Sequence, residues 1–393
     1  MKKIIVQLGL VLAFVVMFNQ TNVYGQIEGN EDINTIVTAV PFLRIAPDAR
    51  AGSMGDAGLA TSTDANAMHF NASKLAFAEN DISVSATYTP WLRALDLQDV
   101  YLAYLSGYKQ IDKISTVGLS LRYFSLGNIQ FTDFNGMSLG SNRPNEFEIA
   151  GAYARQLSDN FALGVSLKFI YSRLANGTYN GSDIRPGIAA GADISATYKT
   201  DKGIFGQEGN QLTIGGAITN LGTKITYTTD AFGEFIPSNL GVGVAYEHAI
   251  DDYNSIVFAI DANKLLVPTP DTINVSGDPD ILDYKEVGVA TAVFSSFNDA
   301  PGGFSEEMRE FSYSVGLEYW YDKQFAVRAG YFHEDPTKGN RKYFTVGLGL
   351  KYNIFGLNFS YLVPTSNRTN PLDNTLRFSL VFDFGSIPAG TPE

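Results

Sequence analysis

The strongest constraint on this chain is a pattern that repeats from residue 80 onward. Segments of about 10 to 13 residues alternate apolar and polar side chains and are separated by turns. Successive side chains of a strand point to opposite faces, so each segment predicts a β-strand with one apolar face. Tyr313 and Leu317, for example, oppose Ser314 and Glu318. The fourteen predicted strands are 80–89, 98–108, 114–125, 146–157, 160–173, 186–199, 210–222, 238–249, 254–264, 310–321, 324–333, 341–353, 355–363 and 375–385.

Such alternation also occurs in soluble antiparallel sandwiches, but three features favour a membrane barrel. The segments exceed the usual strand length of about 5–6 residues and match a tilted membrane crossing. Aromatic residues gather near strand ends, where interface girdles lie. The polar faces carry charges of both signs, which suit a hydrated lumen, because a basic residue facing mid-membrane lipid costs about 2–4 kcal/mol. The predicted lumen charges include Arg122, Lys168, Asp193, Glu318, Arg328, Lys351 and Asp383.

The connections between the predicted strands alternate between short and long. Short ones include 250–253 and 321–323, whereas 126–145 and 265–309 are long. Outer-membrane barrels have short periplasmic turns and longer extracellular loops. We therefore expect an all-β fold, a 14-stranded antiparallel transmembrane barrel in the bacterial outer membrane. Both termini would be periplasmic and the long loops extracellular.

Composition agrees with this class and excludes others. The chain has 38 Gly, 21 Tyr and 27 Phe, and only 18% of its residues are charged. It has no cysteine, which excludes disulfides, Cys-ligated zinc and thiol nucleophiles. With 28 Lys and Arg against 41 Asp and Glu, the net charge of −13 argues against binding to nucleic acid. The three histidines have no ligand spacing, so we expect no metal, no cofactor and no enzyme activity.

The residues before the first predicted strand have a different composition and pattern from the strand region. Residues 1–25 combine Lys2 and Lys3 with a short apolar run and Gly25, which predicts a secretory signal peptide; an uncleaved anchor is the alternative. Residues 26–79 are predicted to form a periplasmic segment and a plug inside the lumen. The part from 41 to 79 is rich in Gly and Ala, with a short helix expected near 64–70. A loose periplasmic leader is the alternative. Residues 80–385 would form the barrel and 386–393 a periplasmic tail.

Polar and small residues of the predicted plug are candidates for fastening it. Charges that are buried must be paired. Asp48 and Arg50 are therefore expected to bond to lumen charges such as Arg328, Lys351 or Asp383. The full set of predicted plug residues is Asp48, Arg50, Met54 and Asn71.

The long connection 265–309 is the strongest candidate for a binding surface. Loops longer than about 12–15 residues are usually functional or disordered. This one has apolar ends, and 287–297 is expected to form a short helix or an extra strand. Exposed apolar groups of this kind mark a surface for a partner or ligand, whereas the alternative is a lid folded over the barrel mouth. The predicted contact residues are Leu265, Leu266, Val267 and Phe304, together with Trp91 and Leu92 of the first long loop.

The predicted plug also carries a family resemblance. The run FLRIAPDARAGSMGDAG from Phe42 to Gly58, followed by DANAMHFNASKLA, resembles the N-terminal hatch of the FadL superfamily of outer-membrane transporters. Its particular form, together with YTPWL at 88–92, is similar to the PorV (LptO) family of the Bacteroidetes type IX secretion system. Asn71-Ala72-Ser73 departs from the Asn-Pro-Ala found in many FadL-like proteins, which weakens any transfer of fatty-acid transport.

The resemblance implies a non-enzymatic component of protein secretion. Its partners would be a translocon barrel of the SprA/Sov type, a surface sortase of the PorU type and secreted cargo with type IX C-terminal domains. Membrane lipid and lipopolysaccharide would surround it. Transport or binding of hydrophobic small molecules or lipids is the alternative on superfamily analogy. An open porin is a third hypothesis.

Overall fold

The computed structural model describes residues 33–92, 97, 99–132, 137–175, 177–179, 182–200, 209–228, 233–270, 286–365 and 375–386. The chain divides into residues 1–33 and 34–393, and the second unit is the one described below. The predicted signal peptide and almost all of the predicted tail lie outside the described residues.

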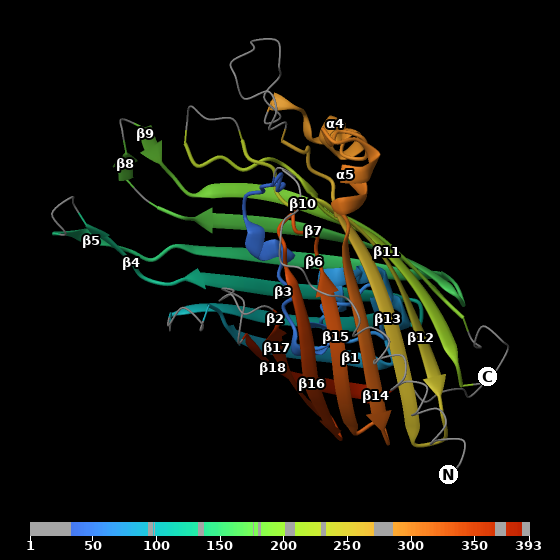
Figure 1. The fold of residues 1–393 in the computed structure, drawn as a ribbon. Coiled ribbons are helices and arrows are strands. Elements are labelled where there is room, and N and C mark those ends of the chain that lie inside the picture. Colours follow the sequence, from blue (N-terminus) through green and yellow to red (C-terminus); the bar gives the residue numbers. More distant parts are fainter. Residues whose placement is uncertain are drawn as a thin grey trace. The chain divides into compact units, whose positions relative to one another are not determined.

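Fourteen strands form one closed antiparallel barrel, as the sequence predicts (Figure 1). Each barrel strand pairs with the previous one along the chain, and the first and last strands close the ring, with Ile82 opposite Phe384. The largest departure from the predicted boundaries is in β2, which continues to Asp112. The strands are β1 (Asn80–Pro90), β2 (Val100–Asp112), β3 (Ser115–Leu126), β6 (Asn145–Ser158), β7 (Phe161–Arg173), β10 (Gly187–Lys199), β11 (Gln211–Gly222), β12 (Asn239–Ala249), β13 (Asn254–Leu265), β14 (Ser312–Tyr321), β15 (Phe325–His333), β16 (Lys342–Tyr352), β17 (Phe355–Pro364) and β18 (Leu376–Ser386).

The alternating pattern separates the two faces of the barrel. On β7, Leu163, Val165 and Leu167 are exposed on the outer face, whereas Gly164 and Ser166 between them face inward and are buried. An apolar outer face is the one that lipid would cover. The inner face therefore carries the small and polar residues that the N-terminal part of the chain contacts.

The long connections contain several short elements, and the sequence analysis predicted only one of them. Two small hairpins extend from the barrel, β4 (Ile129–Thr132) with β5 (Ser138–Asn142) and β8 (Gly177–Tyr179) with β9 (Ser182–Ile184) (Figure 1). The segment expected at 287–297 to be a helix or a strand forms helix α4 (Val289–Ser295), and a second helix, α5 (Phe304–Arg309), follows it. None of the helices in the described part of the chain is both long enough and apolar enough to cross a membrane.

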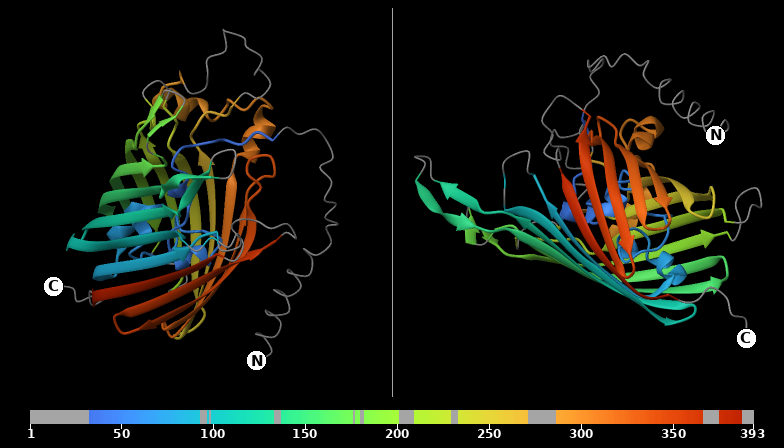
Figure 2. Two further views of the ribbon diagram at one scale, coloured as in Figure 1. Left: turned by 90° about the vertical axis from the view of Figure 1, so that its left-hand side faces the viewer. Right: turned by 90° about the horizontal axis from the view of Figure 1, so that it is seen from below.

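Residues 34–78, called the inner segment below, lie within the ring of strands (Figures 1 and 2, blue). They form four short helices: η1 (Pro41–Arg44), α2 (Ala49–Gly52), α3 (Ala67–Phe70) and η2 (Ala72–Phe77). Helix η2 contacts β6, β7 and β10, whereas α2 contacts β16, β17 and β18. The inner segment therefore touches widely separated parts of the wall. The helix expected near 64–70 is the shorter α3.

Candidate functional site

A buried ion-pair network joins the inner segment to strands β14 and β15. Arg50 donates from Nε and Nη2 to the two carboxylate oxygens of Glu318, at 2.9 and 2.7 Å. Arg328 donates from Nε to Glu318 at 2.6 Å, and both of these side chains are 0% exposed. Asp64 lies 3.1 Å from Arg50. Two carboxylates thus balance two guanidinium groups, which is the condition for keeping such charges buried.

This network corrects the expected partners of the predicted plug residues. Arg50 does bond to a predicted lumen charge, but that charge is Glu318, with Asp64 also paired to Arg50, and the named partners Arg328, Lys351 and Asp383 are wrong. Lys351 and Asp383 pair with each other at 2.8 Å near the turn side of the barrel. The physical reason is charge: Arg328 carries the same charge as Arg50 and shares its partner Glu318, whereas Lys351 and Asp383 neutralise each other.

Asp48 has a local structural role. Its side chain accepts a hydrogen bond from the Ala51 backbone N–H at 2.9 Å and so caps helix α2. Burial, followed by the nearby charge of Asp64, raises the pKa of Asp48 to about 6. The expected bond from Asp48 to a basic lumen residue is therefore replaced by a helix cap.

The second side of the inner segment is fastened by uncharged groups. Asn71 donates from Nδ2 to the hydroxyl of Thr197 on β10 at 2.9 Å. The Ser73 backbone N–H donates to the Ser195 hydroxyl of the same strand at 3.0 Å. Each of these side chains is buried. Because buried polar groups are costly when unpaired, these bonds specify one position of η2 against the wall.

Backbone packing fixes the segment between these two sides. A Cβ atom built on Gly330 of β15 would lie 2.1 Å from the Gly55 nitrogen and from the Met54 carbonyl carbon. Gly55 itself has φ of 67°, a value that favours glycine. Met54 is fully buried beside Gly316 of β14. Small residues on both partners therefore allow the backbone of the inner segment to lie directly on the wall.

The remaining predicted lumen charges also face inward. Arg122 donates to the carbonyl oxygens of Phe42 and Leu43 at 3.1 Å each and contacts Nδ1 of His69 at 2.5 Å. Burial, followed by the charge of Arg122, holds the pKa of His69 well below its usual range, so its ring is neutral and Nδ1 can accept. Lys168 and Asp193 pair at 2.9 Å. Arg122 thus links helix η1 to β3.

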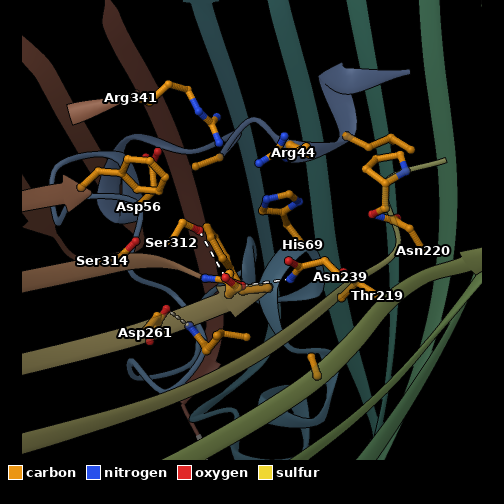
Figure 3. A pocket seen from close by; sticks show the side chains of 18 residues that line it. Arg44, Asp56, His69, Thr219, Asn220, Asn239, Asp261, Ser312, Ser314 and Arg341 are labelled. Carbon is orange, nitrogen blue, oxygen red and sulfur yellow. Dashed lines mark hydrogen bonds between the residues drawn. The ribbon is translucent and has the colours of Figure 1, made fainter. Parts of the chain in front are cut away.

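A cavity of about 110 Å³ lies between the inner segment and the wall (Figure 3). Its lining is largely polar and includes Arg44, His69, Asn239 and Asp261. The Asp261 carboxylate already accepts from the Gly58 and Leu59 backbone N–H groups, at 2.7 and 2.9 Å. Sites for drug-sized apolar ligands occupy about 300–1,000 Å³. This cavity suits a few water molecules better than a hydrophobic compound.

Beyond the ends of the strands, residues 286–311 form a helical cap held by buried charges. Lys264 of β13 lies 3.0 Å from Glu307 and also contacts Glu310. Lys338 lies 2.5 Å from Glu306 and 3.0 Å from Glu310. This network of opposite charges attaches helix α5 and Glu310 to strand β13 and to the connection between β15 and β16. The helical cap is therefore an ordered part of the barrel mouth.

Several predicted contact residues lie beneath this cap. Leu265, Leu266 and Val267 are only 8%, 2% and 1% exposed, so the expectation that they form an exposed apolar surface is wrong. Val267 packs against Phe235 and Ala292, because the chain passes under the cap as it leaves β13.

Residues of the first long loop behave similarly. Trp91 is buried and its ring lies edge-on to Phe124 at 6.5 Å, within a cluster that includes Phe42. Leu92 is only partly buried and has φ of 54°. The expected exposed surface at Trp91 is therefore also wrong, because the ring fills space above helix η1.

The exposed apolar residues of the cap were only partly predicted. Phe304 is 78% exposed, as expected. Phe294, at 79%, and Phe297 are also exposed and lie in the apolar run 287–297 without having been singled out, whereas the exposed Met308 was missed. Phe297 follows Phe294 by three positions and Met308 follows Phe304 by four, which is helical spacing and could have revealed them. These four residues, which belong to helix α4, helix α5 and the turn between them, are called the apolar patch below.

The described residues contain no group of three or more His, Asp or Glu side chains arranged to hold a metal ion.

Lys74 of the inner segment gives a pH-dependent prediction. It donates from Nζ to the Gly58 carbonyl at 2.5 Å, and burial lowers its pKa from 10.5 to about 8. Between these values the unfolded state holds a proton that the folded state has released, so the free energy of unfolding should rise with pH. Denaturant unfolding at several pH values between about 8 and 10 would measure this rise. The substitution Lys74→Met should abolish this rise in the free energy of unfolding. Lys351→Met, which removes a lysine at a half-exposed site, should keep the rise. A rise in Lys74→Met equal to that of the wild type would contradict the prediction.

Comparisons with known proteins agree with this architecture. The Pseudomonas putida toluene transporter TodX has a similar fold, with a TM-score of 0.50, 12% identity, and coverage of 91% of this chain and 100% of TodX. A Pseudomonas aeruginosa FadL homologue aligns with a TM-score of 0.43 and 11% identity, over 89% of this chain and 99% of that one. At 12% identity the likeness to TodX concerns the fold alone. No curated protein gives a significant sequence match.

The sequence also matches a protein family directly. Residues 28–272, more than half of the chain, match the family described as "Type IX secretion system protein PorV". The matched region includes the whole inner segment and the strands up to β13. The chain therefore belongs to the PorV family of type IX secretion system proteins, which are outer-membrane β-barrels.

Proposed function

We propose that this protein is a non-enzymatic docking component of type IX secretion. It would bind a translocon barrel of the SprA/Sov type and help to pass cargo with C-terminal signal domains to a surface sortase of the PorU type. Membership of the PorV family supports the pathway. The apolar patch, held in place on an ion-paired helical cap, is the observation that supports docking.

The chemistry of the apolar patch fits a protein partner. Two of its phenylalanines are almost four-fifths exposed, at 79% and 78%. Exposed apolar groups gathered on one surface mark interaction sites, and aromatic residues are enriched among the residues that dominate binding. Because Glu306, Glu307 and Glu310 fasten the cap from beneath, the patch is presented with little loss of conformational freedom on binding.

The double substitution Phe294→Ser/Phe304→Ser should therefore weaken association with the translocon while the barrel stays folded. We expect a loss of about 2–4 kcal/mol in binding, on the scale of two interfacial aromatic residues. Co-purification with the translocon from native membranes, quantified by mass spectrometry, is the measurement.

Phe258→Ser, on the lipid-facing side of β13, is the matched control, because it removes an exposed phenylalanine far from the cap. Heat-dependent mobility in gels would show that each variant forms a barrel. Co-purification of the double variant at the wild-type level would assign docking to another surface. Deletion of 270–305 should also abolish co-purification.

We further propose that the inner segment acts as a plug that keeps the lumen closed to solutes. Its fastening to β14 and to β10 and the small polar cavity support this role. The same cavity weighs against transport of hydrophobic small molecules.

The proposal also includes the domain boundaries: a signal peptide at 1–25, a periplasmic and plug segment at 26–79, and a periplasmic tail at 386–393. Both termini would be periplasmic, with the helical cap outside the cell.

A further inference from the structure

Three arginines gather at the long-loop rim of the barrel and form what is called the arginine cluster below: Arg143, Arg173 and Arg185. They belong to the ends of β6, β7 and β10, which are neighbours in the barrel. Arg173 at the end of β7 pairs with Asn145 of β6, which follows Arg143 by two residues in the sequence. Ser172, just before Arg173, pairs with Gly187 of β10, which follows Arg185 by two residues. With strands about 4.8 Å apart, the three residues lie within roughly 10 Å across the sheet.

Among the described residues, none of these three arginines forms an ion pair with a carboxylate; Asp183, two residues before Arg185, is the nearest acidic residue along the chain. Arg143 and Arg185 are exposed. Arg173 donates to the Arg143 carbonyl at 3.4 Å, while its Nε has no hydrogen-bond partner among the described groups. The nearby carboxylate of Glu146 faces the lumen, where the Ser172 hydroxyl donates to it at 2.6 Å. Like charges placed side by side repel, so an anionic ligand would relieve the repulsion.

An aromatic girdle fixes the height of the cluster relative to a membrane. Tyr123 is paired with Phe147, whose ring stacks on that of Tyr171 at 5.0 Å. Arg173 lies on the same outer face as Tyr171, two residues or about 7 Å further toward the long loops. Aromatic girdles mark the level of lipid headgroups. The Arg173 side chain therefore lies at the level where lipid phosphates are found.

We propose that the arginine cluster binds the phosphate groups of an anionic membrane lipid, with the acyl chains lying over the aromatic girdle. Planar guanidinium groups bind phosphate through paired hydrogen bonds, and basic residues near a membrane surface attract anionic lipids. The exposed apolar strand faces directly below the girdle favour a lipid over a free phosphate, because they provide a surface for the acyl chains.

Native mass spectrometry of the full-length protein in detergent would test this site. The protein would be mixed separately with lipid A, dioleoyl phosphatidylglycerol and dioleoyl phosphatidylcholine. We expect retention of phosphatidylglycerol or lipid A above phosphatidylcholine. Arg143→Gln, Arg173→Gln and Arg185→Gln should each weaken that retention about fivefold. Preference for lipid A or for phosphatidylglycerol would identify which anionic lipid is bound.

Arg155→Gln is the matched control. Arg155 is an exposed arginine on the same strand β6, at its opposite end, where it donates to the Tyr153 and Ser115 hydroxyls. Heat-dependent gel mobility would show that all variants fold. Equal retention of the three lipids by the wild-type protein would overturn the proposal. An equal loss in Arg155→Gln and in the cluster variants would also overturn it.

Discussion

Replacing Glu318 with glutamine should destabilise the folded barrel by about 3–5 kcal/mol, the cost of removing one member of a buried ion pair. The Glu318 carboxylate is 0% exposed and accepts from both Arg50 and Arg328. An amide cannot balance two guanidinium groups. Arg328, whose other close polar contact is Asn358, would then be buried without a counter-charge. The free energy of unfolding in denaturant, in a fixed lipid or detergent environment, is the measurement.

Asp383→Asn provides the matched control for Glu318→Gln. Asp383 is also an inner-face carboxylate of the barrel, paired with Lys351 at 2.8 Å, but the Lys351 side chain is 41% exposed. Exposed pairs of this kind contribute about 0–1 kcal/mol. Comparable losses in the two variants would mean that the Arg50–Glu318–Arg328 network has no special weight.

Replacing Gly330 with valine should displace the inner segment and open the lumen. The new Cβ would lie 2.1 Å from backbone atoms of Met54 and Gly55, far inside any permitted contact, and backbone cannot give way as a flexible side chain can. If the inner segment is the plug, planar bilayers containing the wild-type protein should stay silent. The variant should conduct, and its inner segment should become sensitive to protease.

Gly151→Val tests whether this effect is specific. Gly151 lies on the outer face of β6, and a Cβ there would meet nothing within 4 Å. This variant should remain silent and resist protease like the wild type. Heat-dependent gel mobility would confirm that both valine variants form barrels. A folded, silent Gly330→Val barrel would contradict the assignment of the inner segment as the seal.

Local patterns in the sequence determined the strands of this protein. Alternation with period two is a property of each strand taken alone, so the inward and outward faces of β7 and β14 could be assigned without knowing their neighbours. The length of the strands and their mixed inner charges indicated a closed membrane barrel. The motif from Phe42 to Gly58 indicated the family.

Only the tertiary structure decided which residues meet. Arg50 and Glu318 are 268 positions apart, and their contact depends on barrel closure and on the path of the inner segment. The same holds for the cap, since Val267 is buried against Ala292 of helix α4 and against Phe235, whereas Phe294 and Phe304 stay exposed. The physical reason is that apolar periodicity specifies which face of an element is buried, whereas the surface that buries it comes from distant parts of the chain.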